Sequence, residues 1–426
     1  MAAMLASPSL ALARAAGRLS RRLGRGGGTS LPGKLLLSVR AGAVAELGAG
    51  LPRGSVLVSA TNGKTTTARL IAACARAAGW RLVANQSGAN LASGVATALL
   101  DDAALPLAER AELGLFEVDE AALPAVAAQL RPRALVLMNL FRDQLDRHGE
   151  LEALSTRWAD ALAGLPPAVT TVVANADDPA VAALVEGRAG SITFGIDDPA
   201  VALPALPHAA DAKRCRRCGA PLEHDLVLLG HLGHWRCPAC GAARPRPDVR
   251  ATRVELDGAR AIALRVETPA GPIEARLGLP GLHNAYNATA AIAGALALGV
   301  PAELIGPALA GSANAFGRFE RVRVGGQELA ILLAKNPAGA NEIVRTILLD
   351  GAPLHLLVAL NDRTADGHDV SWIWDVDFEL LLPRIADLTL SGDRAHDLGL
   401  RFRYAGLDSG RMRIVPDLER GLDAAL

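Results

Sequence analysis

A strand, a polar loop and a helix follow one another between residues 55 and 79, and this order constrains the fold more than any other feature of the chain. Val56-Leu57-Val58 is an apolar run typical of a buried strand, and residues 68–78 form an Ala- and Leu-rich helical stretch that ends at Gly79. The loop between them reads Ser59-Ala60-Thr61-Asn62-Gly63-Lys64-Thr65-Thr66. Because the first amides of a helix are free to bind phosphate oxygens, this segment predicts a nucleotide-phosphate loop.

The residues of this loop suit phosphate chemistry, although Val58 stands where the common Gly-x-x-x-x-Gly-Lys-Thr form has its first glycine. The amides of residues 62–65 can surround phosphate oxygens, and Lys64 supplies a positive charge to the terminal phosphates. A hydroxyl of Thr65 or Thr66 can reach Mg²⁺. The alternative is a polar strand-to-helix turn that carries an unrelated lysine.

Strand-like and helical runs continue to alternate beyond the loop, which predicts an α/β fold with a parallel, doubly wound sheet. Between residues 195 and 248 the composition shifts to Pro, His, Cys and Arg, which indicates an insertion. Further strand runs are expected at residues 113–118, 134–138, 169–174, 252–256, 261–267 and 273–277, with a helix at about 284–298.

Gly317-Arg318-Phe319-Glu320 marks a boundary, after which a second α/β pattern begins with strand runs at residues 330–333, 354–360 and 388–390. The expected domains are an N-terminal helical segment (1–54), a nucleotide-binding central domain (55–320, with an insert at about 211–248) and a smaller C-terminal α/β domain (321–426). The chain stops at Leu426 within a helical pattern, so we expect the last domain to be incomplete at its end.

Four of the five cysteines lie at Cys215, Cys218, Cys237 and Cys240, with eighteen residues between the two pairs. This is the spacing of a tetrahedral structural zinc site, and four thiolates leave no open position for water. A disulfide or a redox pair is the alternative. The remaining Cys74 is expected to be a small core residue, and the nearby histidines are expected at the surface rather than as ligands: His224, His231 and His234.

Composition excludes several classes of function. Lys+Arg and Asp+Glu each number 44, whereas a nucleic-acid-binding protein normally has a basic excess, so we expect no nucleic-acid partner. Residues 1–30 contain several arginines on an Ala/Leu background, and their order favours an amphipathic helix over a targeting peptide. There is no long apolar run, so no transmembrane segment is expected. The cysteine usage indicates a reducing, cytoplasmic compartment.

Taken together, the motifs resemble those of the Mur ligase superfamily, whose members use ATP to activate a carboxylate and trap it with an amine. Residues 61–66 match the phosphate loop of that family, with Ala60 in place of its usual glycine, and Glu117 matches its magnesium-binding glutamate. Gln144 replaces a metal-binding histidine, so the resemblance does not extend to a second metal site. The resemblance implies further nucleotide contacts at Asn175, Asp177, Asp178, His283, Asn284, Asn287 and Arg318.

Within that superfamily the chain resembles the MurT family, the ligase-like subunits of lipid II isoglutaminyl synthases. Only about fifty residues precede the phosphate loop, and the ribbon lies at the MurT position. Residues 332–337 read Leu-Leu-Ala-Lys-Asn-Pro where amino-acid-adding ligases have Asp-Tyr-Ala-His-Asn-Pro, and residues 361–375 are MurT-like. The resemblance implies ATP, Mg²⁺ and structural Zn²⁺, and amidation of the D-glutamate α-carboxylate of lipid II to D-isoglutamine through an acyl phosphate.

The same resemblance implies a glutaminase partner of the GatD type that supplies ammonia, and a location at the inner face of the cell membrane. A catalytic Cys-His pair requires an orienting carboxylate, which the family takes from the C-terminal stretch of this subunit. Asp369 is the first candidate, followed by Asp366, Asp362 and Asp375. Trp372 and Trp374 fit either a core or a partner surface equally well.

Two other functions stay open on the sequence. One is an amino-acid-adding ligase of the muramyl or folylpolyglutamate type, which the changed segment before Pro337 and the ribbon disfavour. The other is a non-enzymatic zinc-ribbon scaffold with a relict phosphate loop, which the zero net charge and the several ATP motifs disfavour.

Overall fold

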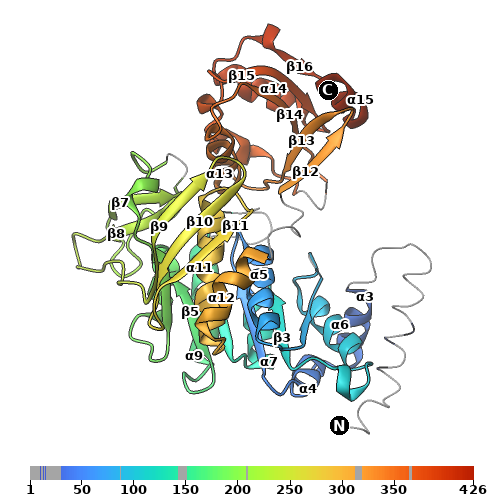
Figure 1. Ribbon diagram of the computed structural model, residues 1–426, viewed down its shortest axis with the longest axis vertical. Helices are drawn as coiled ribbons and strands as arrows, with labels where there is room; N and C mark the ends of the chain where they lie inside the picture. Colours follow the sequence, from blue (N-terminus) through green and yellow to red (C-terminus); the bar gives the residue numbers. More distant parts are fainter. Residues whose placement is uncertain are drawn as a thin grey trace.

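The computed structural model describes residues 10, 13, 15, 30–86, 88–142, 151–207, 210–311, 319–363 and 367–426. Figure 1 shows a larger body that contains most of the chain and, beyond it, a smaller unit formed by the C-terminal residues. Among the described residues, no helix is both long and apolar enough to cross a bilayer.

The larger body is built on a nine-stranded sheet in the order β11-β10-β9-β6-β5-β4-β1-β3-β2. The strands from β2 to β9 in that order pair in parallel, and β10 and β11 are antiparallel at one edge. The strands are β1 Ser55–Ser59, β2 Leu82–Ala84, β3 Leu113–Glu117, β4 Ala134–Leu137, β5 Thr171–Asn175, β6 Ile192–Ile196, β9 Val249–Asp257, β10 Ala261–Glu267 and β11 Ile273–Leu277. The predicted doubly wound α/β fold is confirmed, and the strands after the insertion extend the same sheet.

Helices cover both faces of this sheet because successive side chains of a strand point to opposite sides. Val56 and Val58 of β1 belong to one buried cluster, and Leu57 belongs to the other. The first cluster includes α5 Lys64–Ala77, α11 Leu282–Ala297 and α12 Ala302–Gly311. The second includes α3 Leu31–Val39, α4 Ala43–Gly48, α6 Ala92–Asp102, α7 Leu123–Leu130, α9 Leu151–Ala163 and α10 Pro179–Ala182. Two packed faces explain why the central strands are apolar throughout.

The insertion between β6 and β9 forms an antiparallel hairpin, β7 Glu223–Leu229 and β8 Leu232–Arg236, with a cysteine pair on either side of it. Isolated bridges at Arg214–Pro221 and Arg236–Ala243 form the two turns that carry the cysteines. We call residues 211–248 the cysteine ribbon.

The C-terminal unit begins with a separate hairpin, β12 Phe319–Val324 and β13 Gln327–Leu332. A parallel three-stranded sheet follows in the order β14-β15-β16, formed by Leu354–Ala359, Ile385–Ser391 and Met412–Ile414. Helices α13 Pro337–Leu348, α14 Ala395–Tyr404 and α15 Leu418–Ala425 surround it. Its buried residues form a third cluster, in which Phe402 packs on Phe378 with ring centroids 4.6 Å apart.

Phe402→Ala should lower the stability of the C-terminal unit by about 3–5 kcal/mol, because the side chain is fully buried and leaves a cavity. Hydrogen exchange of the β15 amides measures this loss. Tyr404→Ala is the control, since Tyr404 lies two residues further along α14 but is 74% exposed, and its effect should stay within about 0.5 kcal/mol. Equal losses in the two variants would contradict a separate C-terminal core.

Candidate active site

The phosphate loop joins β1 to α5, and its shape depends on Gly63. This residue has φ +94°, in the left-handed region, directly before the first residue of α5. A Cβ atom there would lie 2.1 Å from Oδ1 of Asn287 on α11. Glycine is therefore required both by the backbone conformation and by the close approach of α11 to the loop.

Lys64 is the first residue of α5, and its ammonium group forms a buried ion pair with Glu120. The Lys64 Nζ to Glu120 Oε2 distance is 2.7 Å, and the two side chains are 9% and 4% exposed. Lys64 Nζ also donates to the carbonyl oxygen of Ala60. Burial raises the pKa of Glu120, whereas the charge and the hydrogen bond of Lys64 lower it. Together the lowering effects outweigh burial, so the pKa of Glu120 lies below its usual range. Glu120 was not predicted from the sequence; its signal was an acidic residue three positions after Glu117.

Thr65 and Glu117, the two residues predicted for magnesium, are brought together. The Thr65 hydroxyl donates to Glu117 Oε2 at 2.5 Å, and Glu117 Oε1 accepts the Gly88 amide at 3.2 Å. Glu117 ends β3, which pairs directly with β1, so its carboxylate lies beside the phosphate loop. A hydroxyl and a carboxylate oxygen are ligands that Mg²⁺ prefers, so these two residues fit the ion.

Asn139, two residues after the end of β4, also holds the phosphate loop in place. Its side chain accepts the Asn62 amide at 2.9 Å and donates to the Asn62 carbonyl at 3.0 Å. Its own carbonyl accepts the Thr61 amide at 3.0 Å. The loop is therefore held in place before any ligand binds, as a binding site of this kind requires.

A cavity of about 120 Å³ extends from the loop between α11, the cysteine ribbon and the C-terminal unit. The predicted residues His283, Asn284 and Asn287 line it together with Asn62 and Gly63. Asn287 Nδ2 donates to Asn284 Oδ1 at 3.0 Å. The other walls come from residues the sequence did not assign, including Leu229, Leu232, Tyr286, Lys335 and Glu342.

The C-terminal unit reaches the loop through Asn336. Asn62 and Asn336 exchange two side-chain hydrogen bonds, at 3.2 and 3.0 Å, and Asn336 also caps α13 by accepting the Gly339 amide at 2.9 Å. Asn336 therefore joins two parts of the chain that are 274 residues apart. No local sequence pattern indicated this contact.

Asn175, Asp177 and Asp178 do not line the cavity; they are fully buried behind it. Asp177 accepts from Arg244 Nε at 2.6 Å and from the Tyr286 hydroxyl at 2.7 Å. Asp178 caps α10 through the amides of Ala180 and Val181. These contacts give the two carboxylates internal roles, and their contact with a nucleotide stays a prediction. Gln144, Arg318 and Asp366 lie outside the described residues.

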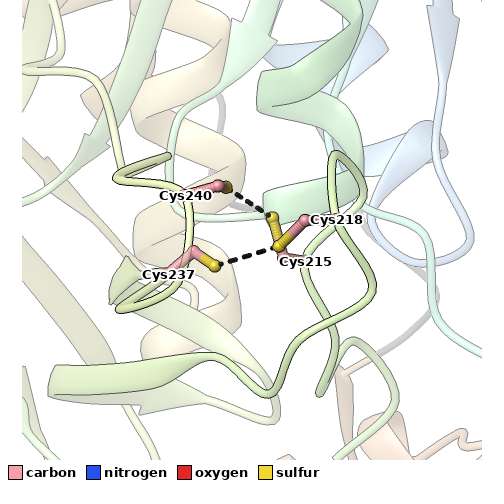
Figure 2. A group of neighbouring side chains, drawn as sticks. All are labelled: Cys215, Cys218, Cys237 and Cys240. Atoms are coloured by element: carbon pink, nitrogen blue, oxygen red, sulfur yellow. Dashed lines mark hydrogen bonds between the residues drawn. The ribbon is translucent and has the colours of Figure 1, made fainter.

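The four predicted zinc ligands converge from the two turns of the ribbon, as Figure 2 shows. Cys215 and Cys240 sulfurs are 3.6 Å apart, Cys218 and Cys237 sulfurs are 3.5 Å apart, and all four lie within 4.8 Å of one another. A tetrahedron with Zn–S bonds of about 2.3 Å has sulfur–sulfur edges of about 3.8 Å. The spacing fits zinc and is far too long for a disulfide, whose bond is about 2.05 Å.

Two further predictions, on the fifth cysteine and on the histidines of the ribbon, have different outcomes. Cys74 is a core residue, and burial raises its pKa to about 12, so the thiol is inert. His231 was expected at the surface, and this is wrong: it is fully buried and lies 4.8 Å from the Phe141 ring. The tip of the β7–β8 hairpin folds into the body, which the sequence alone did not indicate. His224 and His234 are partly buried.

Comparisons with known proteins agree with this geometry. The Mur ligase middle domain family matches residues 58–217, and the MurT ligase C-terminal family matches residues 333–426. A pseudomurein peptide ligase type C from Methanothermus fervidus superposes with a TM-score of 0.65 at 22% identity, covering 87% of this chain and 68% of that one. Mycobacterium tuberculosis folylpolyglutamate synthase complexed with ADP superposes with a TM-score of 0.61 at 16% identity, covering 91% and 86%. The fold is thus that of a Mur-ligase-type protein, and the phosphate loop lies within the matched middle domain.

A more specific match is to the MurT subunit of lipid II isoglutaminyl synthase (glutamine-hydrolyzing) from Streptococcus pneumoniae strain ATCC BAA-255 / R6. The two are 32% identical over 408 residues, which is 94% of this chain and 87% of that protein. The chain belongs to the MurT family of Mur ligases.

Cys240→Ser should remove bound zinc and lower solubility, because the ribbon is too small to have a core of its own. Metal analysis of the purified protein measures the zinc content. Cys74→Ala is the control, since Cys74 lies outside the ribbon and should leave one zinc per chain. A wild-type protein purified without zinc would contradict the assignment.

Lys64→Met should abolish ATP turnover and also destabilise the protein by about 3–5 kcal/mol, because it leaves the Glu120 carboxylate buried without its partner. The double variant Lys64→Met, Glu120→Gln should recover most of the stability in urea unfolding but none of the turnover. Recovery of turnover in the double variant would show that Lys64 has no role in phosphate chemistry.

Proposed function

We propose that this chain is the ATP-dependent ligase subunit that amidates the D-glutamate α-carboxylate of lipid II to D-isoglutamine. The observation that carries this proposal is the match over 94% of the chain to a relative named as such a subunit. The described residues support it, since Asn62 and Gly63 of the loop line the cavity. The next two residues of the loop are a lysine paired with Glu120 and a threonine paired with Glu117. The substrate, the cofactors ATP and Mg²⁺ and the partner are all part of the proposal.

The reaction has two steps. The substrate carboxylate oxygen attacks the γ-phosphorus of ATP, the bond to the β-phosphate oxygen breaks, and an acyl phosphate and ADP form. Ammonia then attacks the acyl carbon, inorganic phosphate leaves, and the nitrogen loses a proton to give the amide. Stabilising charge on the transferring phosphoryl group is the main requirement of the first step.

The residues of the loop have distinct roles in that step. The amides after Gly63 and the ammonium of Lys64 bind the phosphates, and the ion pair with Glu120 holds the lysine side chain at the loop. Thr65 and Glu117 would hold Mg²⁺, which neutralises phosphate charge when bound. His283, Asn284 and Asn287, with the apolar wall around them, form the remaining part of the nucleotide pocket.

The ammonia source in this proposal is a glutaminase subunit that docks on the C-terminal unit. Asp369 is exposed, and its Oδ1 accepts the Ser371 amide at 2.8 Å, which fixes the turn. The Ser371 side chain and, to a smaller extent, this amide lower the pKa of the Asp369 carboxyl. The two other described candidates are already in ion pairs within the chain. Asp375 Oδ2 lies 3.2 Å from a guanidinium nitrogen of Arg142, and Asp362 Oδ2 lies 3.7 Å from one of Arg394. Among the three candidates that the structure describes, Asp369 therefore fits best a carboxylate offered to a partner's histidine.

Exposed aromatic side chains near this turn also suit a partner surface. Trp374 is 47% exposed and stacks edge-on against Tyr404 at 5.6 Å, whereas Trp372 packs partly against the core. Large aromatic residues are enriched where proteins bind one another. Trp374 therefore suits a partner surface, whereas Trp372 belongs partly to the core.

The two alternative functions are less well supported. An amino-acid-adding ligase fits poorly with membership of the MurT family, and a scaffold without activity fits poorly with a buried, paired lysine in the phosphate loop. The proposed location is the cytoplasmic face of the cell membrane, because the proposed acceptor is attached to a lipid. ATP hydrolysis that requires lipid II and ammonia would test the whole proposal.

Asp369→Asn should abolish amidation driven by glutamine and leave amidation driven by added ammonium within about twofold, because ligase chemistry uses other residues. The measurement is isoglutamine formation by the complex with each nitrogen source. Asp408→Asn is the matched control, since Asp408 is also exposed in the C-terminal unit and accepts an amide two residues later, at 2.7 Å. Loss of activity with ammonium as well would place Asp369 in the ligase site instead.

A further inference from the structure

The tip of the β7–β8 hairpin enters the body of the protein and reaches the nucleotide cavity. Leu229 and Leu232, on either side of the tip, line that cavity. Between them His231 has no exposed surface, and its Nε2 lies 3.2 Å from Oδ2 of Asp178, which is equally buried. The left-handed Gly230 packs so closely on the Phe141 ring that a Cβ atom would lie 2.9 Å from it.

A short series of contacts links His231 to the phosphate loop: His231 faces Asp178, and hydrogen bonds continue from Asp178 to the loop. Asp178 Oδ2, the atom that faces His231, accepts the Leu140 amide at 2.9 Å. The next amide, of Phe141, donates to the Thr61 hydroxyl at 3.0 Å, and that hydroxyl donates to the Phe141 carbonyl at 3.2 Å. A change at the hairpin tip would therefore be transmitted to the loop through residues 140–141.

A second series of contacts starts from the ribbon residues beside the cysteines. The Trp235 indole, two residues before Cys237, donates to the Ala176 carbonyl at 3.0 Å. Arg244, four residues after Cys240, pairs with Asp177, which also accepts from the cavity residue Tyr286. The ribbon is thus fixed to the segment behind the cavity on both sides of its second cysteine pair.

We propose that the cysteine ribbon is a working part of the nucleotide site, with His231 as a positioning residue for the phosphate loop. Zinc binding at the base of the hairpin and nucleotide binding at its tip would then be coupled, each raising the affinity for the other. This inference rests on the proposed nucleotide site. A purely structural ribbon would stabilise the fold without changing nucleotide affinity.

The test compares three variants of the full chain by binding of a fluorescent, non-hydrolysable ATP analogue with Mg²⁺. His231→Leu removes the imidazole that faces Asp178 and should weaken binding about fivefold or more while zinc content stays at the wild-type level. His231→Gln places an amide donor near the same point and should restore binding. Arg236→Ala is the matched control, since Arg236 lies in the same hairpin, at the end of β8, but is exposed. Among the described contacts its side chain pairs only within the hairpin, with Glu223 and Asp225.

Unchanged affinity in His231→Leu, with only a lower melting temperature, would overturn the proposal. Lys64→Ala separates this outcome from failure of the site itself: if that variant also binds normally, the nucleotide site has been misplaced. If His231→Leu does not fold, a measurement on the wild-type protein tests the proposal instead. Its zinc affinity, measured by competition with a zinc-selective chelator, should rise about fivefold or more with saturating analogue, because coupling between two sites is reciprocal. An unchanged zinc affinity would reject the coupling.

Discussion

The pairing of β1 between β3 and β4 is the constraint on which the site depends. Val58 lies opposite Glu117 on one side, and Ser59 lies opposite Leu137 on the other. Since the three strands are parallel, the segments that follow them all emerge at the same edge of the sheet. The phosphate loop, the carboxylates after β3 and Asn139 after β4 are brought together by this register alone.

Charged side chains near the site lie in ion pairs. These pairs fix the geometry of the site more than they add to the stability of the fold. Lys64 has Glu120, Arg244 has Asp177, and Arg345 has Glu342 at 2.7 Å. Burial raises the pKa of Glu342, and Arg345 lowers it only in part. Removing charges from water costs free energy that such pairs only partly recover, so their value lies in fixing one geometry. For Lys64, that geometry keeps the ammonium group at the loop.

Several polar contacts join the C-terminal unit to the body. Asn336 pairs with Asn62 of the phosphate loop, and Arg142 pairs with Asp375. Arg345 donates to the Leu228 carbonyl on β7 at 2.8 Å. The cysteine ribbon therefore contacts both the phosphate-loop supports and the C-terminal unit. A ligase of the proposed kind needs the nucleotide and the acceptor to be aligned between these parts. Polar contacts of this kind can break and form as the parts move.

Short-range patterns in the sequence determined the strands, the phosphate loop and the zinc spacing. The strand at Val56-Leu57-Val58, the turn at Gly63 and the paired cysteines each depend on neighbours within a few residues, so their signals are readable without the fold. Thr65 and Glu117 were matched through a family resemblance, and the register of β1 and β3 brings them together.

Other features were decided only by the tertiary structure. Glu120 meets Lys64 across 56 residues, and Asn336 meets Asn62 across 274. His231 reads in the sequence as one more polar residue near a zinc site, yet the fold buries it against Asp178. The surroundings of a buried polar side chain depend on which distant segments pack against it. Local composition does not show those segments, so the sequence alone did not indicate these contacts.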